Sequence, residues 1–459
     1  MKKIVEKNKE YIVDVIDNGY EGEGIAKIDG FTIFIPNAIK GEKIKILIVK
    51  VLSSHAFGKI IEILKKSEYR VEEDCKTYKR CGGCNLRHID YEETLHMKQM
   101  VVQNLVNKNL KNKIEVLPTW GMGNPYYYRN KLQFPVGKDK EGNAIVGVFA
   151  NRTHEIIRLE ECMLQEKQAT QIAKDVVKLI NKYKISVYDE TNQTGLLRHI
   201  VIKTGFRSRE VMVILVINEK ELPYQEEIVK ELTSKYIEIV SVVLNINSKN
   251  TNVILGEKNI NVLGDGYIKD YLGEYCFKIS PLSFYQVNPV QAEALYNIAI
   301  ENAGITKEDI VFDLYCGIGT ITLFAAKYAK KVYGVEIVEQ AIKDAKENAM
   351  INNIENVEFI AGDTEKILTD LIENKKIVPD VVIVDPPRRG LDKTSINNIL
   401  KIRPKKFTYI SCNPATLMRD LSLLEEIYEI KMVQPVDMFP FTSHVECVSV
   451  LELKESIEK

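Results

Sequence analysis

The sequence lacks the features that mark several special classes of protein. It contains no internal repeat, no low-complexity tract and no apolar run near the roughly 20 residues of a membrane-spanning helix. The segment 1–15 has basic residues but neither an apolar core nor a small-residue cleavage site, so we expect no signal peptide, no membrane partner and a cytoplasmic location. The 459 residues are 45% hydrophobic and 28% charged, which indicates an ordered chain of about two to four domains.

The sequence also has almost no net charge, which taken whole argues against a nucleic-acid partner. It holds 63 Lys and Arg residues against 64 Asp and Glu residues. Residues 1–163 carry 27 basic and 22 acidic side chains, a charge of +5, whereas the remaining residues carry 36 and 42, a charge of −6. So mild a split is also typical of two ordinary solvated surfaces, and charge alone therefore identifies no partner.

Three domains are predicted from the pattern of strands and helices. Residues 1–66 contain short β-rich runs about 8–12 residues apart, which predicts a small OB-like β-barrel of the kind that often binds oligonucleotides. Residues 67–280 combine a cysteine cluster, a helix near 91–109 and alternating helices and strands, which indicates a central α+β domain. Residues 281–459 alternate strands with helices and predict a doubly wound, Rossmann-like α/β domain.

Acidic residues and glycines gather at the strand ends of the last domain. The first strand leads into Asp313–Gly319 (DLYCGIG), whose two glycines let the backbone approach a ligand closely. Glu336 ends the next strand, where a carboxylate can accept hydrogen bonds from both ribose hydroxyls. Asp363 and Asp385 follow the third and fourth strands. Thr322 stands where a dinucleotide fingerprint has its third glycine, and the whole order fits S-adenosylmethionine better than nicotinamide.

A cysteine follows the fifth strand of this domain. Cys412 is succeeded by Asn413, a good helix cap, and by Pro414, which suits the first helical position. The helix N-terminus favours a thiolate, whereas burial opposes it. A buried core cysteine is the ordinary alternative, but the position at the ligand-binding edge favours a nucleophile. Glu446 opens the final strand and can serve as a base at the same edge.

Four further cysteines form a candidate ligand set, namely Cys75, Cys81, Cys84 and Cys162. Four thiolates suit either a tetrahedral zinc ion or an iron–sulfur cluster, and the spacing matches neither standard ferredoxin pattern. Disulfides are not expected in a reducing compartment. The remaining cysteines are interpreted as packing or loop residues: Cys276, Cys316 and Cys447.

Together these motifs resemble those of the RNA uracil-5-methyltransferases that use S-adenosylmethionine, and the resemblance covers nearly the whole chain. The barrel resembles the RNA-binding TRAM domain. Ser283–Asn288 (SFYQVN) matches the segment whose glutamine, here Gln286, contacts the cofactor. The resemblance implies further cofactor contacts at Tyr315, Gly317, Glu336, Asp363 and Asp385. It also implies that the helix near 92–120 packs on the catalytic domain.

The resemblance assigns the chemical roles as well. The four clustered cysteines match the ligands of a [4Fe–4S] cluster, which favours iron–sulfur over zinc. Cys412 matches the nucleophile that adds to uracil C6, and Glu446 matches the base that removes the C5 proton. Members with the cluster typically methylate 23S ribosomal RNA and related members modify tRNA. We therefore expect a monomeric enzyme acting on 23S rRNA, with tRNA as the alternative substrate.

The target base must leave its stack to reach such a pocket. Phe284 or the run Tyr126–Tyr128 could stack on RNA bases, with Arg129 and Lys131 holding phosphates, although runs of tyrosines more often pack in a core.

Two other functions stay open at this point. An RNA cytosine-5-methyltransferase that uses two cysteines places one beside the proline after the fourth strand, where this chain has Asp385-Pro386-Pro387. A non-catalytic RNA-binding iron–sulfur sensor would keep the barrel and the cysteine set but would need neither Cys412 nor Glu446.

Overall fold

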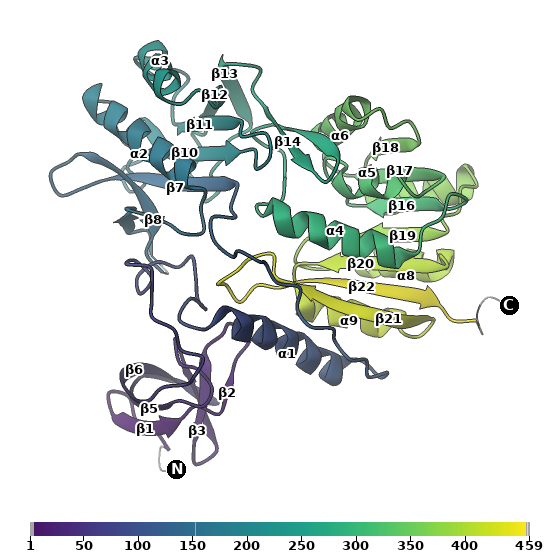
Figure 1. The fold of residues 1–459 in the computed structure, drawn as a ribbon, viewed down its shortest axis with the longest axis horizontal. Coiled ribbons are helices and arrows are strands. Elements are labelled where there is room, and N and C mark those ends of the chain that lie inside the picture. Colours follow the sequence, from purple (N-terminus) through teal and green to yellow (C-terminus); the bar gives the residue numbers. More distant parts are fainter. Residues whose placement is uncertain (1–3, 152, 456, 458–459) are drawn as a thin grey trace. The chain divides into compact units, whose positions relative to one another are not determined.

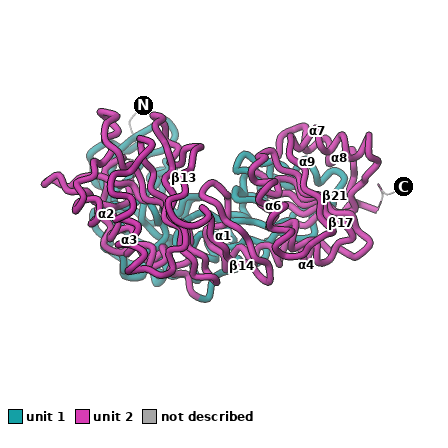
Figure 2. Tube along the Cα trace, turned by 90° about the horizontal axis from the view of Figure 1, so that it is seen from above, with its two compact units in different colours: residues 1–123, 387–390, 411–449 teal, residues 124–386, 391–410, 450–459 magenta. Residues whose placement is uncertain are grey.

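The structure is a computed structural model, and it describes residues 4–151, 153–455 and 457. Figure 2 shows the two compact units that the chain forms. Unit 1 comprises residues 1–123, 387–390 and 411–449, and unit 2 comprises residues 124–386, 391–410 and 450–459. The domain boundaries expected after residues 66 and 280 stay predictions. No helix in the described ranges is long and apolar enough to cross a membrane.

Unit 1 begins with a six-stranded β-barrel. Its strands pair in the order β1-β5-β6-β4-β3-β2, and only Val15 and Ile16 separate β1 from β2, so the two ends of the order meet and the sheet closes. Side chains alternate between the two faces, and Ile44, Ile46 and Ile48 of β5 belong to the barrel core. The strands are β1 (Glu10–Asp14), β2 (Asp17–Asn18), β3 (Gly24–Ile28), β4 (Phe31–Ile35), β5 (Lys43–Val51) and β6 (His55–Lys65) (Figure 1).

The long helix α1 (Tyr91–Asn109) belongs to the same unit. It packs against α9 (Pro414–Leu424) and β21 (Tyr428–Val436), which come far later in the chain. The buried ammonium of Lys98 pairs with the buried carboxylate of Asp437, 339 residues away in sequence. The helix is therefore fixed to the C-terminal segment by an ion pair that water does not reach.

Unit 2 begins with a seven-stranded sheet whose order is β13-β12-β11-β10-β7-β8-β9. Every residue of β10 and β11 is buried, so this pair forms the centre of the sheet. Two helices, α2 (Lys167–Lys182) and α3 (Gln225–Lys235), share one hydrophobic core with it. The strands are β7 (Lys131–Lys138), β8 (Ala144–Phe149), β9 (Ile156–Arg158), β10 (Leu197–Thr204), β11 (Val211–Ile217), β12 (Ile239–Ile246) and β13 (Lys258–Leu263). A hairpin of β14 (Ile268–Leu272) and β15 (Tyr275–Ile279) follows.

The second large sheet is the Rossmann-like sheet that the sequence predicted. Five strands pair in parallel in the order β18-β17-β16-β19-β20, and the sheet continues with β22 and β21. The chain order reverses at β16, which has β17 on one side and β19 on the other. Open α/β sheets bind ligands beyond the carboxyl ends of strands at such a point.

Besides β21, this sheet contains β16 (Ile310–Leu314), β17 (Lys331–Glu336), β18 (Val357–Ala361), β19 (Val381–Val384), β20 (Lys406–Ser411) and β22 (Glu446–Leu453). Its connections contain α4 (Pro289–Ala303), α5 (Thr320–Ala326), α6 (Glu339–Ile351), α7 (Thr364–Thr369), the π-helical turn η1 (Asp370–Asn374) and α8 (Lys393–Ile402).

Candidate active site

The turn between β16 and α5 has the conformation that its glycines were expected to allow. Tyr315, Gly317 and Gly319 all have positive φ angles, of 70°, 55° and 85°. A Cβ atom on Gly319 would lie 2.9 Å from the ring of Phe359, so both the backbone angle and the space demand glycine there. A Cβ atom on Gly317 would meet nothing within 4 Å. The backbone at Gly317 is therefore open to close approach by a ligand.

Glu336 joins this turn to the end of β17. Its Oε2 accepts the N–H of Gly317 at 3.3 Å, and its Oε1 accepts the N–H of Val338 at 2.9 Å. These two bonds hold the carboxylate at the strand end where a ribose would be bound. The structure thus brings together Gly317 and Glu336, which lie in different motifs of the sequence.

Asp363 lies one residue beyond a glycine that is tied to the same place. The N–H of Gly362 donates to the carbonyl oxygen of Glu336 at 2.9 Å. The carboxylate of Asp363 caps α7 by accepting the N–H groups of Glu365 and Lys366. The predicted cofactor residue therefore also has a structural role, which fixes its orientation.

Two carboxyl groups lie at the ends of the neighbouring central strands, β16 and β19. Burial raises the pKa of Asp313 to about 7, and burial together with Asp313 raises the pKa of Asp385 to about 7. Oδ2 of Asp313 accepts the hydroxyl of Thr322, the residue that replaces the third fingerprint glycine. Near neutral pH these acids can change charge at the point where the chain order reverses.

Gln286 lies on the loop between β15 and α4. Residues in and next to the sheet that contains β7 and β10 hold that loop by hydrogen bonds. Nδ2 of Asn130 donates to the carbonyl oxygen of Gln286 at 3.0 Å, and its N–H donates to that of Val287 at 2.9 Å. Nζ of Lys203 donates to the carbonyl oxygens of Ser280 at 2.7 Å and Ser283 at 3.0 Å. Sequence reasoning missed Asn130 and Lys203. The available signal was a lysine within the buried strand β10.

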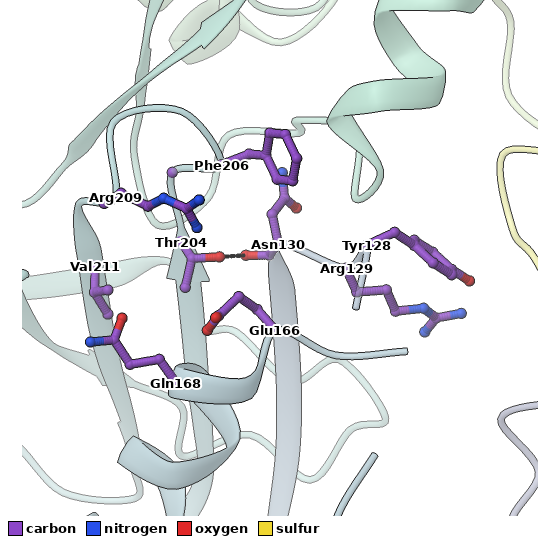
Figure 3. Close-up of a pocket in the computed structure, with 10 residues that line it drawn as sticks. Tyr128, Arg129, Asn130, Glu166, Gln168, Thr204, Phe206, Arg209 and Val211 are labelled. Carbon is purple, nitrogen blue, oxygen red and sulfur yellow. Dashed lines mark hydrogen bonds between the residues drawn. The ribbon is translucent and has the colours of Figure 1, made fainter. Parts of the chain in front are cut away.

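A pocket lies beside Asn130 in unit 2 (Figure 3). Its lining includes Arg129, Arg209 and Phe206, whose side chain is 38% exposed, and the Thr204 hydroxyl donates to the Asn130 carbonyl oxygen at 3.3 Å. Guanidinium groups beside an exposed ring can bind RNA phosphates and bases. Tyr128 also lines this pocket but is only 2% exposed, so it packs inside the unit and offers no open ring face.

Cys412 belongs to unit 1 and lies on a turn whose neighbouring residues are held by hydrogen bonds. It directly follows β20, and Asn413 caps α9 by accepting the N–H of Ala415 at 3.1 Å. The carbonyl oxygen of Arg388 accepts hydrogen bonds from Nδ2 of Asn413 and from the hydroxyl of Thr416, each at 3.1 Å. Cys412 itself is partly exposed, as a nucleophile must be.

Glu446 is the first residue of β22, the neighbour of β20 in the sheet, and is 4% exposed. The next residue, Cys447, is buried, and burial together with Glu446 raises the pKa of its thiol well above the usual range. Cys447 is therefore a neutral packing residue. Burial raises the pKa of the Tyr20 hydroxyl, and the thiols of Cys447 and Cys412 raise it further, so both thiols lie within electrostatic range of the same tyrosine.

The four clustered cysteines do not form a recognisable metal site. None is in a disulfide and each is half-buried. The N–H of Gly83 donates to Sγ of Cys81 at 3.3 Å, and Sγ of Cys75 is 3.4 Å from the hydroxyl of Thr77. Among residues 4–151, 153–455 and 457, no group of three or more His, Cys, Asp or Glu side chains is arranged to hold a metal ion. The prediction of an iron–sulfur domain is therefore not supported by the part of the chain that the structure describes.

Comparison with known proteins identifies the family of this chain. The family model described as tRNA (Uracil-5-)-methyltransferase matches residues 90–454, and the TRAM domain model matches residues 5–61. The chain is 47% identical to an uncharacterized RNA methyltransferase of Clostridium tetani, with 97% of each chain covered. It is 45% identical to one of Clostridium acetobutylicum, with 98% of this chain and 99% of the other covered.

A solved structure is also similar over most of its length. It is the Pyrococcus abyssi tRNA (uracil-54, C5)-methyltransferase in complex with S-adenosyl-L-homocysteine, and the TM-score is 0.77 at 26% sequence identity. The similarity covers 96% of this chain and 100% of that one.

Proposed function

The chain belongs to the tRNA (uracil-5-)-methyltransferase family of S-adenosylmethionine-dependent RNA methyltransferases, and from that premise we propose that it methylates C5 of a uridine in 23S ribosomal RNA, with Cys412 as nucleophile and Glu446 as base. The observation that carries the two roles is the position of Cys412 directly after β20 and of Glu446 at the start of the neighbouring strand β22. Family membership sets aside both the cytosine methyltransferase and the non-catalytic sensor.

Cys412 supplies the activation that uracil needs, because C5 of uracil is a poor nucleophile. Its thiolate forms a bond to C6, and the electron pair of the C5–C6 double bond moves toward C5 and O4. S-adenosylmethionine, when bound, supplies an electrophilic methyl group on its sulfonium. The enolate-like C5 that Cys412 has created can then form its new bond to that methyl carbon, while the bond from this carbon to sulfur breaks and neutral S-adenosylhomocysteine is the leaving group.

Glu446 completes the reaction by accepting the proton that C5 still carries. The C5–H electron pair restores the C5–C6 double bond, and the C6–S bond breaks to return the thiolate of Cys412. A carboxylate that is 4% exposed is well shielded from water, which competes for such a proton.

The proposed cofactor contacts are Gln286, Tyr315, Gly317, Glu336, Asp363 and Asp385. What supports them is the open backbone at Gly317, the carboxylate of Glu336 bonded to that turn, and the acids at the ends of β16 and β19. A carboxylate near the cofactor would favour the positive sulfonium.

The affinity for S-adenosylmethionine is expected to increase with pH through about pH 7 and to level off near pH 8. The pKa of Asp385 is raised to about 7 by burial and by Asp313, so the acid is mostly neutral at pH 6 and mostly ionised at pH 8. Because a cation binds the ionised form better, we expect Kd to be roughly tenfold higher at pH 6 than at pH 8. Titration calorimetry at the two pH values would measure this change.

The matched control for this experiment is S-adenosylhomocysteine, whose sulfur is neutral and whose amino-acid end is the same. Its Kd should change much less, and the variant Asp385→Asn should lose the pH dependence for S-adenosylmethionine. An equal pH dependence for both ligands in the wild type would contradict the assignment.

The choice of 23S rRNA over tRNA is supported by the cysteine set that resembles that of rRNA-modifying members. The solved relative in Pyrococcus abyssi is a tRNA enzyme, so tRNA is the second candidate. The deciding experiment is to map 5-methyluridine in rRNA and tRNA from a strain that lacks this protein. Loss of the modification from 23S rRNA alone is the expected result, and loss from tRNA alone would reassign the substrate.

The [4Fe–4S] cluster also stays a proposal, and no step of the reaction is assigned to it. Four thiols and the N–H donated to Sγ of Cys81 support it, while the lack of a converging group among the described residues opposes it. Protein purified without oxygen is expected to contain about four iron and four sulfide ions per chain, and Cys84→Ser should lose most of both. Cys276→Ser is the matched control, and iron well below one ion per chain in the wild type would rule the cluster out.

A further inference from the structure

Several hydrogen bonds hold the turn between strands β2 and β3 of the barrel. The N–H of Gly19 donates to the carbonyl oxygen of Glu23 at 2.7 Å, and the N–H of Gly22 donates to that of Gly19 at 3.0 Å. Nδ2 of Asn18 donates to the carbonyl oxygens of Gly22 at 3.2 Å and Ala38 at 3.0 Å. Gly22 has a φ angle of 85°, which favours glycine. We call residues 18–24 the barrel turn.

The barrel turn is hydrogen-bonded to the segment that leads to the proposed base. Nδ2 of Asn85 donates to the carbonyl oxygen of Glu21 at 2.7 Å and lies 2.9 Å from the hydroxyl oxygen of Ser443, to which it also donates. In return, Oδ1 of Asn85 accepts the N–H of Ser443 at 2.8 Å. Ser443 lies three residues before Glu446. One asparagine amide therefore connects the barrel to the segment that directly precedes β22.

A second contact supports the same junction. The N–H groups of Asn85 and Leu86 both donate to the carbonyl oxygen of Phe441, at 3.1 and 3.0 Å. A Cβ atom on Gly22 would lie 2.2 Å from Cδ2 of Leu86, so the barrel turn packs closely against this side chain. All of these residues belong to unit 1. The barrel turn is thus packed and hydrogen-bonded against the segment that leads to Glu446.

Tyr20 stands in the middle of the barrel turn and is 46% exposed. Partial burial raises the pKa of its hydroxyl, the thiols of Cys447 and Cys412 raise it further, and the guanidinium of Arg388 opposes them. The tyrosine therefore lies within electrostatic range of the proposed nucleophile. The proposed methyl-transfer reaction assigns no role to Tyr20.

We propose that Tyr20, held by the barrel turn and by Asn85, packs its ring against the RNA nucleotide next to the target uridine. The proposal rests on the proposed function, since it assigns a substrate contact beside Cys412. When a base leaves the stack to reach Cys412, its neighbour loses a stacking partner, and an exposed ring on a rigid turn can replace it. The fixed backbone keeps the entropy cost of this contact low.

The test compares Tyr20→Ala with Tyr20→Phe in the full-length protein. The RNA is whichever unmodified transcript, 23S rRNA or tRNA, the wild type methylates best. Loss of the ring should weaken RNA binding and raise KM for RNA by about tenfold to hundredfold, whereas the phenylalanine variant should stay within about threefold of wild type. The Kd for S-adenosylmethionine and kcat at saturating RNA should change little, which separates a substrate contact from a folding defect.

Tyr69→Ala is the matched control, because Tyr69 is a 41% exposed tyrosine of the same unit outside the barrel turn, and it should bind RNA like wild type. Asn85→Asp keeps the acceptor for the N–H of Ser443 but removes the donor to Glu21, so it should reproduce part of the loss of Tyr20→Ala.

Equal RNA affinity of Tyr20→Ala and wild type would overturn the proposal. If the wild type methylates no uridine, the proposed function fails instead, and the role of Tyr20 is still decided by the Kd for a 23S rRNA transcript measured without cofactor.

Discussion

Replacing Cys412 by alanine is expected to remove methyl transfer and to abolish covalent trapping by RNA that contains 5-fluorouridine. Without a thiolate at C6, uracil C5 has no route to nucleophilic character, so the rate should fall by about four orders of magnitude or more. Fluorine at C5 cannot leave as a proton, and the wild type should therefore form an adduct that survives denaturing electrophoresis.

The matched control is Cys447→Ala, which removes a buried thiol at the start of the neighbouring strand and should still trap the RNA. Trapping that persists in Cys412→Ala would move the nucleophile to another residue. Unchanged binding of S-adenosylmethionine and RNA by both variants would show that the fold is intact.

Replacing Glu446 by glutamine should have the second largest effect, with a different signature. The first two bond-forming steps need no base, so the RNA should still become attached to Cys412 and methylated at C5. Loss of the C5 proton should then slow by about 10²- to 10⁴-fold, because the amide cannot accept it. Ordinary unmodified RNA should therefore accumulate as a methylated covalent adduct when S-adenosylmethionine is present.

The double variant Cys412→Ala, Glu446→Gln tests this order of events and should form no adduct. If the single variant Glu446→Gln releases methylated RNA at the wild-type rate, another group removes the proton. If it forms no adduct at all, Glu446 acts earlier, for example by orienting the uracil.

The architecture was readable from the sequence because strong local patterns specify it. Parallel strands buried on both faces produce apolar runs, and the intervening helices restore a 3.6-residue period, so the Rossmann-like sheet was predictable from residue 281 onward. The barrel was predictable from its short, evenly spaced strands. The iron–sulfur domain was not supported, because cysteine spacing specifies donor atoms but not whether four thiols converge.

The candidate site, too, was only partly predictable from the sequence. Glycine, acid and cysteine positions at strand ends could be identified one by one, since strand ends in a parallel sheet meet at one edge. The residues that hold them could not. Asn130 and Lys203 support the Gln286 loop from another sheet, and nothing in their own segments indicates that partner.

By itself, then, the sequence determined the fold class, the family motifs and the residue types available for chemistry. Only the tertiary structure decided that Asn85 meets both Glu21 and Ser443, which lie 64 and 358 residues away from it in sequence. The physical reason is range: periodicity and turn chemistry act over a few residues, whereas a hydrogen bond between distant segments exists only after packing has brought them together.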